Sequence, residues 1–395
     1  MGLAGMKIVH VAASSSVTTE QIKLVYVDDS MPGIRRIKSG RGFRYVSASG
    51  KAVREKVVID RILALVIPPA WTDVWICAQD CGHLQVTGRD ARGRKQSRYH
   101  DHWRQFRDAA KYDKLVEFAR ALPRIRRSVT SDLRRHGLPR EKVLAAIVRL
   151  MENSLIRIGN VEYARTNHSY GLTTMRDKHA HVHGSRICFD FCGKSGVQHE
   201  IELNDARLAK IVSECQSLPG QELFQYLDDE GQVQDVGSTD VNDYLREISG
   251  GDFTAKDFRT WGGTSLAAEF LLSFEEFESE TGAKRNVVQA IAQVAKRLGN
   301  TRAVCRKSYI HPAVIVSYLD GSLVSIMPPL STQSSKTSSR LSRHEKGLVK
   351  LLQHSISPRS SSPVNRRQRV IKGRAKLSAV IVHKVPVNKG SATRS

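Results

Sequence analysis

The hydrophobic periodicity of the chain changes near residue 110, and this change constrains the fold more than any other feature. From about residue 21 to 105, short β-like runs such as Leu24–Val27 and Gly42–Val46 are separated by turn signals such as Ser39-Gly40. From about residue 110 the spacing becomes helical, and Glu141–Leu155 places its apolar residues on one face of a helix. This order predicts an α+β protein in which a small antiparallel β-sheet domain precedes a mainly α-helical domain.

A β-hairpin is predicted to interrupt the helical domain. The runs Ile187–Cys192 and Val197–Leu203 flank Gly193-Lys-Ser-Gly196, a typical hairpin turn. Helices resume at Thr254, which has Asp257 at capping-box spacing, and continue through Asn286–Leu298 and after Pro312.

The charge pattern divides the chain further. We expect a leader at 1–20, a β-rich N-terminal domain at 21–108, a mainly helical domain at 109–328 and a basic, mostly disordered tail at 329–395. Residues 331–395 hold fifteen Lys or Arg and a single acid, Glu345. A short helix at His344–His354 and a strand at Val380–His383 are the local structures predicted there. The tail is interpreted as a nonspecific DNA tether, and the alternative is a solvated tail without a function.

The overall charge indicates a polyanionic partner. The chain has 62 Lys and Arg against 39 Asp and Glu, a net charge of +23. Nucleic acid is the usual partner of such a chain, although basic ribosomal and membrane-surface proteins share the property. No run of 18 apolar residues and no signal peptide are expected, so no membrane partner is predicted. Six cysteines are few for this length, which favours a reducing cytoplasm.

The sequence predicts neither a metal nor a nucleotide cofactor. The run from Gly88 to Lys95 has the glycine spacing of a P-loop but lacks its lysine and its Ser or Thr. The histidines His179, His181 and His183 alternate, so on a strand they would share a face, but no carboxylate or thiolate accompanies them. The pairs Cys77/Cys81 and Cys188/Cys192 have three-residue spacing, unlike zinc knuckles.

The segment GRDARGRKQSRYH is better explained as a DNA-binding loop. Arginine forks bind phosphates or guanine edges, and tyrosine supplies a flat apolar surface. A solvated hairpin tip is the alternative. The residues predicted to contact DNA are Arg92, Arg94, Lys95, Gln96, Tyr99 and His100.

Three basic residues of the helical domain are candidates for a catalytic site. Arg157 lies in a short apolar run, Lys194 at the predicted hairpin tip, and Arg259 early in a capped helix. Taken singly, each is more typical of a structural or solvated cation. They are candidates for a catalytic site only if all three lie together.

Four runs of the helical domain, in this order, resemble the catalytic domain of poxvirus-type and bacterial type IB DNA topoisomerases. They are LIRIGNVEY, FCGKSGVQH, KDFRTWGGT and LGNTRAVCRKSYIHP. The runs IPPAW and VTGRDARGRKQ are similar to the N-terminal domain of that family. The resemblance extends from about residue 20 to 325, and four ordered motifs are far more specific than one.

The resemblance implies roles for five residues. Tyr309 would be the nucleophile, and Arg157, Arg259 and Lys194 would complete the site. Asn300 stands where the poxviral and eukaryotic enzymes have histidine, and it can donate a hydrogen bond but brings no charge. Ser97 stands where the family usually has an aromatic residue in the basic loop, which leaves Tyr99 as the nearby aromatic residue.

The implied activity is relaxation of supercoiled duplex DNA through a transient 3′-phosphotyrosine, without metal or ATP. The arginines would hold the phosphate charge and Lys194 would protonate the leaving oxygen. The resemblance also implies a monomer that clamps DNA and, with Asn300, a bacterial source and a place at the nucleoid.

Two other functions remain open at this point. A site-specific tyrosine recombinase shares the catalytic residues, but it usually has histidine where this chain has Lys256. In a noncatalytic architectural DNA-binding protein, Tyr309 would be a packed aromatic residue.

Overall fold

The fold is taken from a computed structural model that describes residues 8–11, 22–274, 279–328 and 339–356. Residues 329–338 and 357–395 of the predicted tail, with the strand predicted at Val380–His383, lie outside these residues. Part of the predicted leader is a strand, because β1 (Ile8–Val11) pairs antiparallel with β2 (Ile22–Val25).

A five-stranded antiparallel sheet forms the N-terminal region, as predicted, with the strand order β4-β3-β5-β6-β7. Side chains of β5 alternate between its faces, so Val74 and Ile76 pack with Ile62 of helix α1, while Trp75 packs on the other face. The elements are β3 (Gly33–Ser39), β4 (Gly42–Val46), α1 (Lys56–Ala64), β5 (Thr72–Cys77), β6 (Leu84–Arg89) and β7 (Lys95–Tyr99).

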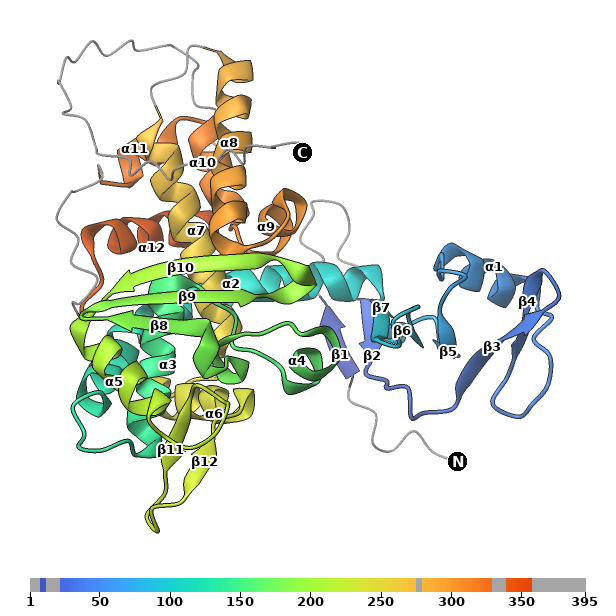
Figure 1. The fold of residues 1–395 in the computed structure, drawn as a ribbon. Helices are drawn as coiled ribbons and strands as arrows, with labels where there is room; N and C mark the ends of the chain where they lie inside the picture. The colour runs from blue at the N-terminus through green and yellow to red at the C-terminus, as the bar shows by residue number, and fades with distance from the viewer. Residues whose placement is uncertain (1–7, 12–21, 275–278, 329–338, 357–395) are drawn as a thin grey trace, which may run out of the picture. The chain divides into compact units, whose positions relative to one another are not determined.

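The long helix α2 (Asp101–Asp132) begins directly after the sheet and continues into the helical region (Figure 1). Phe118 of α2 meets the rings of Phe253 and Phe258 edge to face, at centroid distances of 5.5 and 5.0 Å. Three further helices share this core: α3 (Arg140–Ser154), α6 (Ser238–Ser249) and α7 (Ala255–Ser273).

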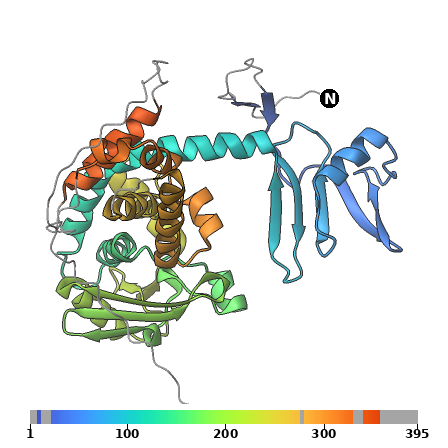
Figure 2. The ribbon, with the colours of Figure 1, turned by 90° about the horizontal axis from the view of Figure 1, so that it is seen from above.

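The predicted hairpin is confirmed, and a third strand extends it into a sheet with the order β10-β9-β8. Cys192 pairs with Gln198 at the turn. Figure 2 shows this sheet along one side of the helices. The elements here are β8 (Ala180–His183), β9 (Arg186–Cys192), β10 (Gln198–Asn204) and α5 (Ala206–Gln216), followed by the small ribbon of β11 (Gln225–Leu227) and β12 (Val233–Asp235).

The three alternating histidines do not share one strand face. His179 is buried at the end of a 3₁₀ turn, η2 (Asp177–His179), and its Nδ1 accepts a hydrogen bond from the Arg176 backbone at 3.0 Å. His181 and His183 are exposed on β8. Among the described residues, no three His, Cys, Asp or Glu side chains are grouped to hold a metal ion.

The remaining helices extend the core to residue 356. They are α8 (Glu280–Leu298), α9 (Arg302–Ser308), α10 (Pro312–Leu319), α11 (Ser322–Ile326) and α12 (Arg343–Ile356). Helix α12 contains the short helix predicted at His344–His354, but Leu348, Leu351 and Leu352 are buried in the core. The folded region therefore continues past residue 328, where we expected the tail to begin. No helix in the described ranges is long and apolar enough to cross a membrane.

Candidate active site

Arg157 and Asn300 meet because they follow the C-terminal ends of helices α3 and α8, which lie beside each other. Helix α8 ends at Leu298 and is capped by Gly299, whose φ of +57° is accessible to glycine at little cost. The next residue, Asn300, accepts a hydrogen bond on Oδ1 from the Arg157 guanidinium, which also donates to the Gly299 carbonyl at 3.4 Å. The Asn300 Nδ2 atom has no nitrogen or oxygen partner among the described residues, and the Cys305 thiol lies beside it.

Arg259 is held in the same place by main-chain carbonyls. Its guanidinium donates to the carbonyl of Leu155 and, at 2.8 Å, to that of Leu298. The central carbon of this guanidinium, Cζ, lies 5.2 Å from the centroid of the Tyr309 ring. Burial and then the neighbouring Arg157 lower the pKa of Arg259 to about 10, so it remains a cation at neutral pH.

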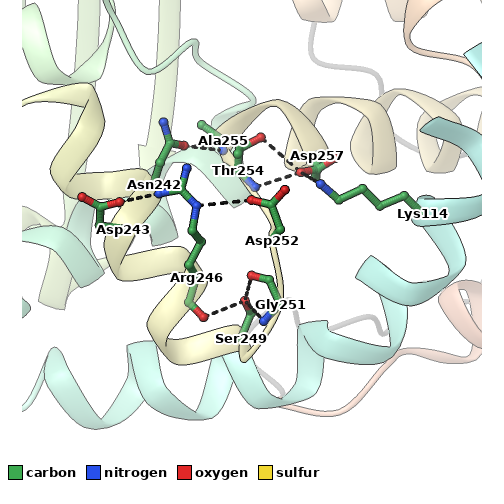
Figure 3. A network of polar contacts seen from close by, with 10 residues as sticks. All are labelled: Lys114, Asn242, Asp243, Arg246, Ser249, Gly251, Asp252, Thr254, Ala255 and Asp257. Atoms are coloured by element: carbon green, nitrogen blue, oxygen red, sulfur yellow. Dashed lines mark hydrogen bonds and ion pairs between the residues drawn. The ribbon is translucent and has the colours of Figure 1, made fainter. Parts of the chain in front are cut away.

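Arg259 follows the first turn of α7. The contacts that hold this turn in place are drawn in Figure 3. The Asp257 carboxylate accepts from the Thr254 backbone at 2.8 Å and pairs with Lys114 of α2 at 3.6 Å. The backbone of Ala255 donates to the Asn242 side chain of α6 at 3.1 Å. The predicted capping-box contact therefore exists, and α2 and α6 both hold the turn that precedes Arg259.

Tyr309 follows the last residue of α9 and lies against α7. Its backbone nitrogen donates to Cys305 at 3.0 Å, and its carbonyl accepts from the Thr264 hydroxyl at 3.2 Å. A Cβ atom added to Gly263 would lie 2.7 Å from the Tyr309 carbonyl oxygen. The sequence GGT in α7 therefore allows the close approach of the Tyr309 backbone.

Lys194 lies at the exposed tip of the hairpin, in the 3₁₀ turn η3 (Lys194–Gly196). It lines a small cavity together with Arg157 and Arg259. The structure thus brings four of the five predicted residues together through direct contacts of Arg157 with Asn300 and of Arg259 with Tyr309. Lys194 joins them only through the shared cavity.

His199 lines the same cavity and was not among the predicted site residues. Its ring stacks on Phe191 of β9 at a centroid distance of 5.0 Å, and Gly193 and Gly299 leave the space that it fills. Burial, followed by the charges of Arg157 and Arg259, lowers its pKa, so the ring is neutral at pH 7. His199 ends the run FCGKSGVQH, but a lone histidine gave no spacing signal of its own.

The predicted DNA-binding loop forms the turn between β6 and β7. In this turn, Asp90 binds Arg94 at 2.6 Å and Gln96 at 3.0 Å, and Lys95 pairs with Asp29 at 2.6 Å. Such exposed ion pairs are weak and can be exchanged for phosphate contacts. Arg92 and Tyr99 are exposed, and His100 caps the start of α2. DNA contact by these residues stays a prediction.

The two arginines give the site an uncompensated positive charge. Within the described part of the chain, neither Arg157 nor Arg259 has a carboxylate partner, and both donate to neutral oxygens. The charge of a buried guanidinium is stabilised most effectively by an anion. The arrangement is therefore suited to a phosphodiester held beside the Tyr309 ring.

Comparison with known proteins identifies the family. Residues 100–322 match the family described as the catalytic core of eukaryotic DNA topoisomerase I, and residues 42–90 match the N-terminal domain of bacterial DNA topoisomerase IB. The DNA topoisomerase 1B of Acanthamoeba polyphaga mimivirus is 32% identical over 287 residues, which cover 71% of this chain and 85% of the viral protein.

The chain belongs to the type IB DNA topoisomerase family. A more distant relative, the DNA topoisomerase 1B of vaccinia virus (strain Copenhagen), is 22% identical over 271 residues, or 66% of this chain and 82% of the relative. The catalytic-core match contains all five predicted site residues of this topoisomerase. Membership of this family favours a topoisomerase over the recombinase and architectural alternatives.

Proposed function

We propose that this topoisomerase relaxes supercoiled duplex DNA by cutting and rejoining one strand through Tyr309. The observation that carries the proposal is the pair of guanidiniums at the Tyr309 ring, that of Arg259 buried and that of Arg157 partly buried, neither with a carboxylate partner among the described residues. Arg157 and Arg259 would bind the two nonbridging oxygens of a phosphodiester and stabilise the charge that grows there in the transition state. Catalysis through the arginines needs no metal ion, because they supply the positive charge that metals supply in other phosphoryl-transfer enzymes.

The reaction consists of one transesterification and its reversal. The Tyr309 hydroxyl oxygen loses its proton to solvent as it attacks phosphorus, a 3′-phosphotyrosine bond forms, and the bond to the 5′ oxygen breaks. Lys194 donates a proton to that leaving oxygen. One phosphoester replaces another, so the bond energy is retained and religation needs no ATP. Rotation of the free 5′ end before religation would remove supercoils of either sign.

Asn300 would act on the phosphate and on Arg157 at once. Its Oδ1 atom holds the Arg157 guanidinium, and its Nδ2 atom would donate to a phosphate oxygen. The amide adds no charge, so its share of transition-state stabilisation should be smaller than that of either arginine.

The wider assignments rest on the family and on charge. We infer a monomer that clamps DNA, with Arg92, Arg94, Lys95, Gln96, Tyr99 and His100 contacting the duplex. The match to a bacterial N-terminal domain supports a bacterial source and a place at the nucleoid, although the relatives described above are viral.

Plasmid relaxation in EDTA without ATP tests the proposal. The native protein should relax positive and negative supercoils of any sequence, whereas Tyr309→Phe should bind DNA without relaxing it. Activity only at a defined sequence would favour a recombinase, and binding without relaxation by the native protein would favour an architectural role. Relaxation of only one sign would contradict free rotation.

A further inference from the structure

The main chain on both sides of Tyr309 is held from a distant helix. Tyr309 follows the C-terminal end of α9, and the last carbonyls of a helix have no partners within it. Such carbonyls need donors from elsewhere in the molecule. In this chain the donors are two consecutive residues of α2, almost 200 positions earlier in the sequence.

Lys111 and Tyr112 bind three carbonyls around the nucleophile. The Tyr112 hydroxyl lies 3.1 Å from the Lys307 carbonyl and 3.0 Å from the Ile310 carbonyl, so its one proton is shared between them. The Lys111 ammonium donates to the Ser308 carbonyl. These contacts enclose Tyr309, whose own carbonyl is bound by Thr264 of α7.

Both side chains also lie near aromatic rings of the same segment. The Lys111 nitrogen is 5.9 Å from the centroid of the Tyr309 ring, on which Arg259 also lies at 5.2 Å. The Tyr112 ring meets that of His311 edge to face at 4.7 Å. Lys111 therefore adds positive charge at the helix C-terminus, where a cation is favourable, and beside the tyrosine ring.

We propose that Lys111 and Tyr112 are positioning residues for the nucleophile, an inference that rests on the role proposed for Tyr309. By fixing the carbonyls on both sides of Tyr309, they hold its main chain so that the hydroxyl stays in line with the phosphate. A small misplacement of a reacting group is costly, because orientation supplies much of the rate of such a reaction. Helix α2 starts two residues after β7, so it also joins the predicted DNA-binding hairpin to the nucleophile.

Single-turnover cleavage of a nicked suicide substrate by the full chain tests the proposal. Tyr112→Phe keeps the ring and removes both hydrogen bonds, and we expect cleavage about 10-fold slower with an unchanged Kd for uncleaved DNA. Lys111→Met should slow cleavage by a similar factor, and Lys111→Arg should restore most of the rate because it keeps a charged donor.

The controls separate positioning from general loosening of α2. Tyr244→Phe makes the same chemical change at the other end of α2, where the Tyr244 hydroxyl binds Asp132 at 2.8 Å. Arg120→Met removes one charge from an exposed position of the same helix. Both variants should cleave within about 2-fold of the native rate at saturating protein, even if Tyr244→Phe lowers Tm.

Each outcome decides the proposal. Slow cleavage by Tyr112→Phe and Lys111→Met alone, with rescue by Lys111→Arg, supports it. Native-rate cleavage by Tyr112→Phe, or an equal loss in Tyr244→Phe, overturns it while leaving the role of Tyr309 intact. If the native protein forms no covalent adduct, the proposed function fails and the positioning role fails with it.

Discussion

Arg259 combines a structural and a catalytic task in one side chain. It is only 6% exposed and joins the ends of α3 and α8 through two carbonyls, while its remaining face lies toward the Tyr309 ring. A lysine has the same charge but lacks the planar fork that makes several parallel bonds.

Arg259→Lys should therefore fold but cleave poorly. We expect the single-turnover cleavage rate to fall about 10²-fold, the loss typical of removing one transition-state donor. The measurement is the cleavage rate at saturating protein, with Kd and Tm as controls. A rate within a few-fold of the native value would remove Arg259 from the phosphate site.

Gly263 provides a test at the backbone of the nucleophile. An alanine methyl there would lie 2.7 Å from the Tyr309 carbonyl oxygen and 3.1 Å from its Cβ atom, so the Tyr309 segment must shift. We expect Gly263→Ala to lower stability by roughly 1–3 kcal/mol, as overpacking does, and to slow cleavage more than DNA binding. Denaturant unfolding and single-turnover cleavage measure the two effects, and unchanged values in both would show that this close approach has no consequence.

The candidate residues could be found from the sequence only as a set. Arg157, Lys194 and Arg259 are ordinary cations when taken singly. They were identified as one site because each lies in one of the ordered family motifs. The pairing of Asn300 with Arg157 had no sequence signal, because it depends on how two helix ends meet. Lys111 and His199 were missed because only the folded chain brings them to the site from distant elements.

At the scale of elements, local signals predicted more than long-range ones. The hairpin and the capped start of α7 were correct, because turn residues and capping boxes act within a few positions. The basic composition around α12 led us to assign this helix to a mostly disordered tail. Its Leu348, Leu351 and Leu352 have the i, i+3, i+4 spacing of a buried face, and only the folded core reveals what covers them.

The docking of α12 predicts a pH dependence. Arg126 of α2 binds Glu345 at 2.6 Å and Glu152 at 2.7 Å, with all three side chains largely buried. Burial alone would raise the pKa of Glu345, but hydrogen bonds and charge from Arg126 outweigh it, so the pKa lies below its ordinary value of 4.5. This stabilisation is complete above that value and is lost as the pH falls through the lower folded one.

Glu345→Gln should lower the free energy of unfolding by roughly 2 kcal/mol at pH 7, since a charged hydrogen bond is lost. It should also flatten the loss of stability on acidification. Denaturant unfolding between neutral and acid pH measures both effects. A parallel pH dependence in native and variant proteins would exclude Glu345 as a source of the acid sensitivity.

At the scale of the whole molecule, positive charge is concentrated at the C-terminal end. Residues 357–395 contain ten Lys or Arg and no acid, although the whole chain has 39 acids. Each phosphate neutralised by such a segment adds to the salt dependence of DNA binding through release of counterions.

A chain ending at Ile356, which retains α12, should bind DNA more weakly and with a shallower dependence on salt. We expect a loss of about 10-fold in affinity at moderate salt, with single-turnover cleavage at saturating protein unchanged. Binding titrations at several salt concentrations measure the slope. An identical slope would mean that the tail is not a DNA tether.

The most direct test of the central claim is to identify the covalent intermediate. The native protein is trapped on a suicide DNA substrate, digested, and the DNA-linked peptide is sequenced by mass spectrometry. The account predicts a single adduct on Tyr309, joined to a 3′ phosphate, with a free 5′ hydroxyl on the released strand. An adduct on another residue, or a 5′-linked phosphate, would contradict it.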